Sequence, residues 1–420
     1  MAEWISKTLG EITSFIAKGI SPKYVEEKSQ DTVQVLNQKC NRNFEISYDE
    51  SRIHNATIKR VPDDKFLRYG DVLINSTGTG TAGRVAQLFN VPVPTTMDGH
   101  MILLRPTDEI EPFYYGYAVK SHQKKIESLA EGSTGQTEIN RRRLQEEIVI
   151  TFPKEKVLQK AIGKFLFQID EKIRNNKQIN NNLEQQAVLL FKKWFIEFDN
   201  SSKNMLETQF GLVPESFKLL KNGELPLVVT DYVANGSFAS LKANVTLYQE
   251  PNYAYFIRNT DLKSGTFEVF VNEHSYNFLS KSTLYGGEII ISNVGDVGSV
   301  FLCPKLDKPM TLGNNIIMLR PERENLRYYL YIWFKWLYGQ SLIQGIKGGS
   351  AQPKFNKTDF KNLPIFLPPD DLLEQFHQIV KPMFELIDEN NTENQALTRT
   401  RDTILPRLMS GELDVSNIEI

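Results

Sequence analysis

Gly70-Asp71-Val72-Leu73-Ile74-Asn75-Ser76 decides the fold, because the chain repeats it as Gly287-Glu288-Ile289-Ile290-Ile291-Ser292-Asn293. In both places an apolar, β-rich run follows a glycine, which is typical of a buried strand. The segment 101–106 returns in the same way at 316–321, and Tyr114-Tyr115 returns as Tyr328-Tyr329. The offset drifts only between about 213 and 218. The sequence therefore predicts a pseudo-two-fold molecule with two divergent copies of one unit.

The first part of each copy has mixed local signals. Short β-rich runs alternate with turn residues, and helical patches occur at 113–129 and 328–338. We expect two compact α+β domains, at residues 1–152 and 201–368.

The second part of each copy is helical, at residues 153–200 and 369–420. Apolar residues recur every three or four positions in both runs, which predicts a coiled-coil seam. At 1.5 Å per residue each helix is about 60 Å long. Asn176, Asn180 and Arg401 occupy polar positions of the same seam. Gly163 and Pro382 predict a kink or a break. The seam or partner-contact residues proposed are Ile169, Leu183, Leu190, Trp194, Phe195, Ile387, Leu397, Ile404 and Leu408.

Two interpretations of these helices remain open at this point. Either they are a self-contained dimerisation or packing element, or they pair with each other inside the chain. Because the order is domain, helix, domain, helix, an internal pair is antiparallel and separates the two domains. Trp194-Phe195, where the first helix ends, is read as seam packing or as a surface for a partner.

Composition narrows the class of protein. The formal net charge of -2 is unusual for a DNA binder, although Lys59-Arg60, Lys124-Lys125 and Arg141-Arg142-Arg143 form local basic clusters. No apolar run approaches the roughly 20 residues of a membrane span, and the first residues lack a signal-peptide pattern. Cys40 and Cys303 do not occupy equivalent places, so we expect neither a repeated disulfide nor a repeated metal site, and a cytoplasmic protein.

Catalytic motifs are missing from the sequence. Residues 78–83 match G-x-G-x-x-G, but no crossover helix follows and the pattern is lost in the second copy. We expect a glycine-rich turn between paired strands that displays Ser76, Thr77 and Arg84. There is no P-loop, no H-E-x-x-H and no Asp/Asn-Pro-Pro-Tyr motif, and His100 aligns with Asn315.

The ends of the helical runs point to a known family. Residues 190–198 and 405–413 resemble the conserved helix ends of the specificity (S) subunit of type I restriction-modification enzymes. Phe366-Leu367-Pro368-Pro369 resembles the start of that family's second conserved helix, whereas the first copy keeps only Phe152-Pro153. The resemblance covers essentially the whole chain.

The resemblance implies a non-catalytic subunit with two target-recognition domains, each reading one half of a bipartite, asymmetric site in double-stranded DNA. An intramolecular, antiparallel coiled coil would set the gap between the halves. Two methyltransferase (M) subunits would flip out adenine and methylate its N6; with restriction (R) subunits the complex would cut DNA. No cofactor would bind this chain, since S-adenosylmethionine, ATP and magnesium are used by the partners.

Base readout is expected between the repeated landmarks, because those landmarks are mostly apolar or turn residues. Arg141 also follows a polar loop that could face phosphate. The proposed DNA contacts are Ser76, Thr77, Thr79, Arg84, Thr134, Gln136 and Arg141 in the first copy, and Asn293, Asp296, Ser299, Lys347, Ser350 and Gln352 in the second.

Two other functions are weighed against this one. One is an enzyme in its own right, such as a stand-alone nuclease or methyltransferase, which the missing motifs disfavour. The other is a coiled-coil protein scaffold without sequence-specific DNA binding.

Overall fold

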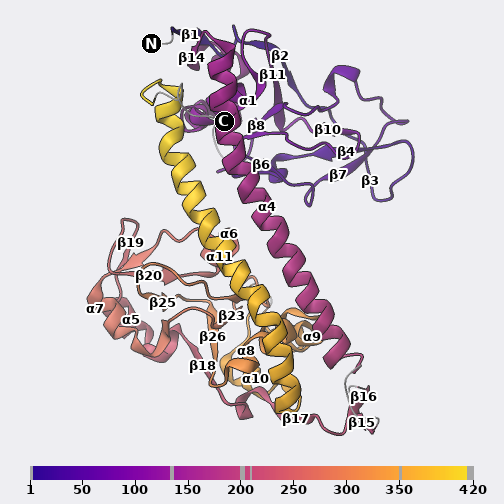
Figure 1. Ribbon diagram of the computed structural model, residues 1–420, viewed down its shortest axis with the longest axis vertical. Helices are drawn as coiled ribbons and strands as arrows, with labels where there is room; N and C mark the ends of the chain where they lie inside the picture. The colour runs from indigo at the N-terminus through magenta and orange to yellow at the C-terminus, as the bar shows by residue number, and fades with distance from the viewer. Residues whose placement is uncertain (1–2, 133–136, 199–203, 209–210, 350–351, 414–420) are drawn as a thin grey trace. The chain divides into compact units, whose positions relative to one another are not determined.

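The computed structural model describes residues 3–132, 137–198, 204–208, 211–349 and 352–413. The chain forms two compact units, made of residues 1–175 with 393–420, and of residues 176–392. Two 40-residue helices, α4 (Lys156–Phe195) and α11 (Asp370–Met409), each run from one unit into the other (Figure 1). Each unit therefore combines an α+β domain with one half of each long helix.

The main sheet of the first unit is antiparallel, with strand order β2-β11-β8-β9. Its strands are β2 (Thr13–Lys18), β8 (Val72–Asn75), β9 (Val85–Gln87) and β11 (Met101–Pro106). Val72 and Ile74 face one apolar cluster, and Leu73 faces another. The run is apolar throughout because both faces of this central strand are covered.

A second sheet of the first unit has the order β10-β4-β7-β3. Its strands are β3 (Tyr24–Val25), β4 (Thr32–Leu36), β7 (Arg52–Asn55) and β10 (Thr95–Met97). Leu36 and Met97 share an apolar cluster with Leu73 and Leu103, so this core lies between the two sheets. Short pairs complete the unit: β1 (Trp4–Thr8) with β14 (Val149–Pro153), β5 (Asn41–Arg42) with β6 (Glu45–Ile46), and β12 (Ala130–Glu131) with β13 (Glu138–Ile139).

The second unit repeats this architecture, as the internal repeat predicts. Its main sheet has the order β18-β26-β23-β24, made of β18 (Leu227–Asp231), β23 (Ile289–Ser292), β24 (Val300–Leu302) and β26 (Ile316–Pro321). The second sheet, β19-β21-β20-β25-β22, is made of β19 (Leu247–Tyr248), β20 (Ala254–Ile257), β21 (Phe270–Val271), β22 (Thr283–Leu284) and β25 (Met310–Leu312). The remaining pairs are β15 (Met205–Thr208) with β16 (Gly211–Pro214), and β17 (Lys218–Lys221) with β27 (Pro364–Leu367). The predicted α+β class and its duplication are confirmed.

Short helices lie between the strands in both units. They are α1 (Pro112–Ser121), α2 (Gln123–Ser128) and α3 (Arg141–Glu147) in the first unit, and α5 (Phe238–Asn244), α6 (Asn259–Ser264), α7 (Glu273–Phe278), α8 (Arg327–Lys335), α9 (Leu337–Gly345) and α10 (Lys357–Asn362) in the second. Tyr114 and Tyr117 of α1 share a core with Leu166 of α4 and Leu408 of α11. No helix within the described ranges is long and apolar enough to cross a membrane.

Neither long helix breaks where the sequence suggested a break. α4 continues through Gly163, where an added Cβ would lie 2.8 Å from the backbone nitrogen of Tyr114. This glycine therefore allows α1 to approach α4 closely. α11 continues through Pro382, which is exposed. Proline has no backbone N–H, so the carbonyl one turn earlier loses its helical partner, and water can bond that carbonyl instead.

The two long helices run antiparallel within the first unit. The guanidinium of Arg401 donates to Asp170 Oδ1 at 2.5 Å, and the hydroxyl of Tyr117 donates to Asp170 Oδ2 at 2.6 Å. Lys172, further along α4, pairs with Glu393, which precedes Arg401 on α11. The side chains of Asp170 and Arg401 are only 7% and 11% exposed. The predicted seam position of Arg401 is therefore a buried ionic contact that joins both helices and α1.

In the second unit an amide group fills the predicted seam position. The Asn180 side chain accepts a hydrogen bond from Asn390 at 2.8 Å and donates to Asn391 at 3.0 Å. Polar seam residues of this kind specify register, because a shifted pairing would leave buried amides without partners.

We predict that Asp170→Ala lowers the free energy of unfolding by about 3 kcal/mol. The variant leaves the buried Arg401 guanidinium with only the exposed Asp402 carboxylate, and it leaves the buried Tyr117 hydroxyl without its acceptor. Urea unfolding of the full chain measures the loss. Lys172→Ala is the matched control: it removes an exposed ion pair with Glu393 and is expected to cost at most about 1 kcal/mol. Equal losses in the two variants would contradict the structural role of the Asp170–Arg401 pair.

Candidate nucleic-acid interface

In the first unit, the turn that follows β8 is bonded to two segments that are distant in sequence. The backbone N–H of Ser76 donates to the carbonyl of His100 at 2.8 Å, and the N–H of Ile139 donates to the carbonyl of Ser76 at 2.7 Å. We call the meeting point of these three segments the turn junction.

The second unit has the same turn junction after β23. The N–H of Asn293 donates to the carbonyl of Asn315 at 3.1 Å, and the N–H of Phe355 donates to the carbonyl of Asn293 at 3.0 Å. The next residue forms an isolated bridge in each unit, Thr77 with Glu138 and Val294 with Lys354. The backbone of the turn junction is thus common to both units, while its side chains differ.

An ion pair with a buried carboxylate is also common to both units, at the end of the two paired strands that lies away from the turn junction. Arg105 contacts Asp71 through two nitrogens, at 2.8 and 2.9 Å, and the Asp71 side chain is only 4% exposed. In the second unit Arg320 contacts Glu288 at 2.9 Å. These four residues lie in the segments that the sequence repeats, and their role is to stabilise the fold.

The glycine-rich sequence 78–83 forms a turn between paired strands, as predicted. β8 and β9 are antiparallel, with Ile74 opposite Val85. Gly83 has φ +87°, and an added Cβ would lie 2.6 Å from the Cα of Glu127. The glycine therefore serves a left-handed turn packed closely against α2, and the dinucleotide-binding interpretation is excluded by this hairpin geometry.

The structure places the first-copy candidates in different environments. The prediction that the turn displays Ser76 is wrong: its side chain is fully buried, because its backbone is bonded on both sides within the turn junction. Thr77 is half-buried and bonds His100 Nδ1 at 2.8 Å. Thr79 is exposed, and Arg84 donates to the carbonyl of Gly80 at 3.0 Å. Thr134 and Gln136 lie outside the described residues.

Arg141 differs from the two arginines that follow it. Asn140 caps α3, of which Arg141 is the first residue. Arg142 pairs with Glu146, and Arg143 pairs with Glu131 and Glu147, where it lowers the pKa of the Glu147 carboxyl. Arg141 is exposed and has no ion-pair partner among the residues that the structure describes. It is the arginine of this run that remains available for an anion.

The second-copy candidates also differ in exposure. Asn293 is half-buried and donates to the carbonyl of Phe355 at 3.3 Å, so part of its role is structural. Asp296 is exposed and accepts from Ser299 at 2.5 Å. Lys347 and Gln352 are exposed, and Ser350 lies outside the described residues.

His100 and Gln38 are polar residues at the turn junction that were not among the predicted DNA contacts. Thr77 lies between them, with its hydroxyl 2.8 Å from His100 Nδ1 and 3.5 Å from Gln38 Oε1. His100 was set aside because it aligns with Asn315. That difference was the available signal, because two surfaces that read different bases must differ in their hydrogen-bonding groups.

The seam candidates are all at least partly buried within the two units. Phe195 and Leu408 are buried, whereas the others are half-buried: Ile169, Leu183, Leu190, Trp194, Ile387, Leu397 and Ile404. Trp194 and Phe195 both contact Phe376 of α11, with ring centroids 6.1 and 5.0 Å apart. These two aromatic residues therefore pack within the second unit.

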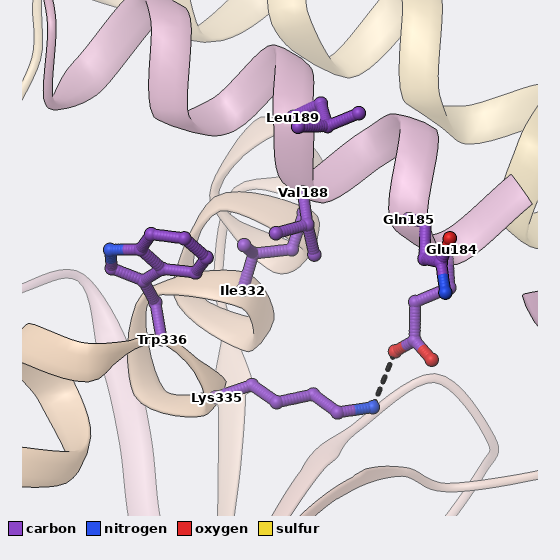
Figure 2. Close-up of a pocket in the computed structure, with 7 residues that line it drawn as sticks. All are labelled: Glu184, Gln185, Val188, Leu189, Ile332, Lys335 and Trp336. Atoms are coloured by element: carbon purple, nitrogen blue, oxygen red, sulfur yellow. Dashed lines mark hydrogen bonds and ion pairs between the residues drawn. The ribbon is translucent and has the colours of Figure 1, made fainter. Parts of the chain in front are cut away.

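A hollow of about 400 Å³ lies between α4 and the α8–α9 segment of the second unit. It is lined by Glu184, Gln185, Val188, Leu189, Ile332, Lys335 and Trp336. Figure 2 shows Val188 and Ile332 meeting beside the Trp336 ring, and an ion pair of 2.5 Å between Glu184 and Lys335. Leu189 is 61% exposed. Leu189 is not predicted from the sequence because it lies off the seam register, and Trp336 is not predicted because it lies outside the two helical runs, between α8 and α9.

Comparisons with known proteins agree with this architecture. Residues 1–185 and 231–399 match the type I restriction modification DNA specificity domain. The chain is 25% identical to the type I restriction enzyme MjaIX specificity subunit of Methanocaldococcus jannaschii, over 99% of this chain and 95% of that protein. It is 23% identical to the HindI specificity subunit of Haemophilus influenzae, over 98% and 100% of the two chains.

A solved structure shares the fold. The S subunit of a type I restriction-modification system from M. genitalium aligns with a TM-score of 0.55 and 20% identity, over 97% of this chain and 96% of that one. Two matched regions, a duplicated α+β domain and two long helices thus agree. The chain belongs to the family of type I restriction-modification DNA specificity subunits.

Proposed function

We propose that this chain is the non-catalytic DNA-recognition subunit of a type I methylation and restriction complex. Each α+β domain reads one half of a bipartite, asymmetric site in double-stranded DNA. The observation that supports this most directly is the turn junction, whose backbone is common to both units and whose side chains differ. A duplicated scaffold with two sets of hydrogen-bonding groups suits two different half-sites.

The partners in this proposal follow from the family. The long helices set the unspecified gap between the half-sites and dock two methyltransferase subunits, which methylate adenine at N6. Restriction subunits added to the same complex cut DNA. S-adenosylmethionine, ATP and magnesium serve those partner subunits, and none of them is assigned to this chain.

Methylation mapping tests the proposed function. Co-expression of this chain with the methyltransferase subunit encoded beside it is expected to place N6-methyladenine in a bipartite motif with a fixed gap. The motif should be absent when this chain is omitted. An intact complex that adds no methylation would favour the scaffold interpretation instead.

Arg141 is proposed as a phosphate contact, because its exposed guanidinium has no ion-pair partner among the described residues. We predict that Arg141→Gln weakens binding of the complex to all DNA sequences similarly and lowers the slope of log K against log salt by about 1. The matched control is Arg142→Gln, since Arg142 already pairs with Glu146. Unchanged salt dependence in the Arg141 variant would rule out this contact.

The hollow beside Leu189 is proposed as a docking point for an apolar side chain on a helix of the methyltransferase subunit. Leu189 is exposed at the edge of an apolar hollow, and an exposed apolar surface of this kind is typical of a protein–protein interface. Lys193, one helical turn beyond Leu189, has no ion-pair partner among the described residues, so an acidic residue next to the anchor would complement it.

We predict that Leu189→Glu weakens capture of the methyltransferase subunit by about tenfold or more, because the docked apolar side chain would strip the new carboxylate of its hydration without giving it a partner. Titration of the purified subunits measures the effect. Val157→Glu is the matched control, since Val157 is 82% exposed on the same helix and outside the hollow. The docking point would be refuted by equal affinities of the two variants.

A further inference from the structure

Asp296 stands on the turn between β23 and β24, within the turn junction of the second unit. Gly295 and Gly298, on either side of it, have φ +77° and +98°. These left-handed residues carry the turn out from the sheet, and the Asp296 side chain is exposed. The turn itself is anchored, because the N–H of Gly298 donates to the carbonyl of Ser292 at 2.9 Å.

Three donors hold one oxygen of this exposed carboxylate. Asp296 Oδ2 lies 2.6 Å from Lys263 Nζ, 2.5 Å from Ser299 Oγ and 3.5 Å from Asn259 Nδ2. Oδ1 has no hydrogen-bond partner among the residues that the structure describes. The bonds to Lys263 and Ser299 lower the pKa of Asp296, so the group stays ionised near neutral pH. Oδ1 is therefore an oriented acceptor with no donor hydrogen.

An ordinary surface ion pair would not need this arrangement. Such pairs contribute little to stability. One flexible contact between Lys263 and Asp296 would be enough to form an ordinary surface ion pair. Here donors from α6 and from the turn converge on one oxygen, and the other oxygen has no hydrogen-bond partner among the described residues. A carboxylate repels the phosphates of DNA, so on a DNA-reading surface we expect it to face a hydrogen-bond donor at a base edge.

The first unit presents a different set of polar groups at its turn junction. There Gln38, Thr77 and His100 form a hydrogen-bonded chain that orients the exposed imidazole through Nδ1. Gln38 and Asn259 occupy equivalent positions. Each stands two residues after the end of a strand, β4 at Leu36 and β20 at Ile257, and each of these strands pairs in parallel with one neighbour, β10 or β25. The turn junction is thus where two similar scaffolds present different hydrogen-bonding chemistry.

We propose that Asp296 reads a base of the second half-site by accepting a hydrogen bond from the exocyclic amino group of cytosine in the major groove. Guanine and thymine present acceptors at that edge, which a carboxylate oxygen repels. Adenine presents its amino group beside the N7 acceptor, whereas cytosine presents the amino group without such a neighbour. Lys263 and Ser299 are positioning residues, since they act through Asp296. The proposal rests on the proposed function of the chain.

Asp296→Asn tests this assignment, because it keeps the shape and replaces one acceptor oxygen by an amino donor. Methylation is mapped for the co-expressed complex, and its binding is measured on duplexes that carry each base pair at every position of the second half-site. We expect discrimination for one C·G pair to fall about 10- to 100-fold. The first half-site and the gap should not change.

Two further variants separate base reading from a structural role. Lys263→Met and Ser299→Ala are expected to reduce discrimination at the same base pair, more weakly than Asp296→Asn. Asp307→Asn is the matched control, since Asp307 is an exposed carboxylate of the same unit that accepts from Tyr255 outside the turn junction. It should leave the motif unchanged.

The outcomes distinguish this inference from the proposed function. If the wild-type complex yields a bipartite motif and Asp296→Asn leaves both motif and discrimination unchanged, the inference alone is overturned. The same holds if the variant weakens binding to all duplexes equally. If the wild-type complex is intact and yields no motif, the proposed function fails together with the inference.

Discussion

The contact on which the rest of the structure depends is the buried ion pair between Asp170 of α4 and Arg401 of α11. Burying either charge without the other would cost several kcal/mol. The C-terminal part of α11 therefore packs in the first unit, together with the N-terminal domain. Tyr117 adds α1 to the same contact. The first unit is therefore built from segments at both ends of the chain, and it is complete only when α11 has formed.

Short strand pairs join each domain to its helix. β1 pairs with β14, which precedes α4, and β17 pairs with β27, which precedes α11. The first and last strands of each α+β domain thus lie side by side, so the long helix leaves the domain next to the point where the chain entered it. Two arginine–carboxylate pairs with buried carboxylates, Asp71–Arg105 and Glu288–Arg320, link equivalent elements in both units. These contacts make the scaffold the same in both units and leave the turns free to differ.

That separation of scaffold and turn suits a DNA specificity subunit. The backbone bonds of the turn junction recur in both units, while Thr77 and His100 in one unit are replaced by Val294 and Asn315 in the other. Because base edges are read by donors and acceptors, a change of side chain on a fixed backbone changes the preferred base without disturbing the core. The helices, whose apolar residues are mostly half-buried or buried, keep a separate exposed feature, the hollow beside Leu189.

The sequence by itself determined the duplication, the buried strands at residues 72–74 and 289–291, the two long helices and the seam positions of Asn180 and Arg401, because each follows from a local repeat or from helical spacing. Only the tertiary structure decided that Ser76 is buried, that Gly163 lets α1 approach α4 closely and that Leu189 borders a hollow. It also decided that one oxygen of Asp296 has no hydrogen-bond partner in the part of the chain that the structure describes. These features depend on contacts between segments far apart in the chain. A local pattern shows which residues are polar or small, whereas the fold alone decides which atoms they meet.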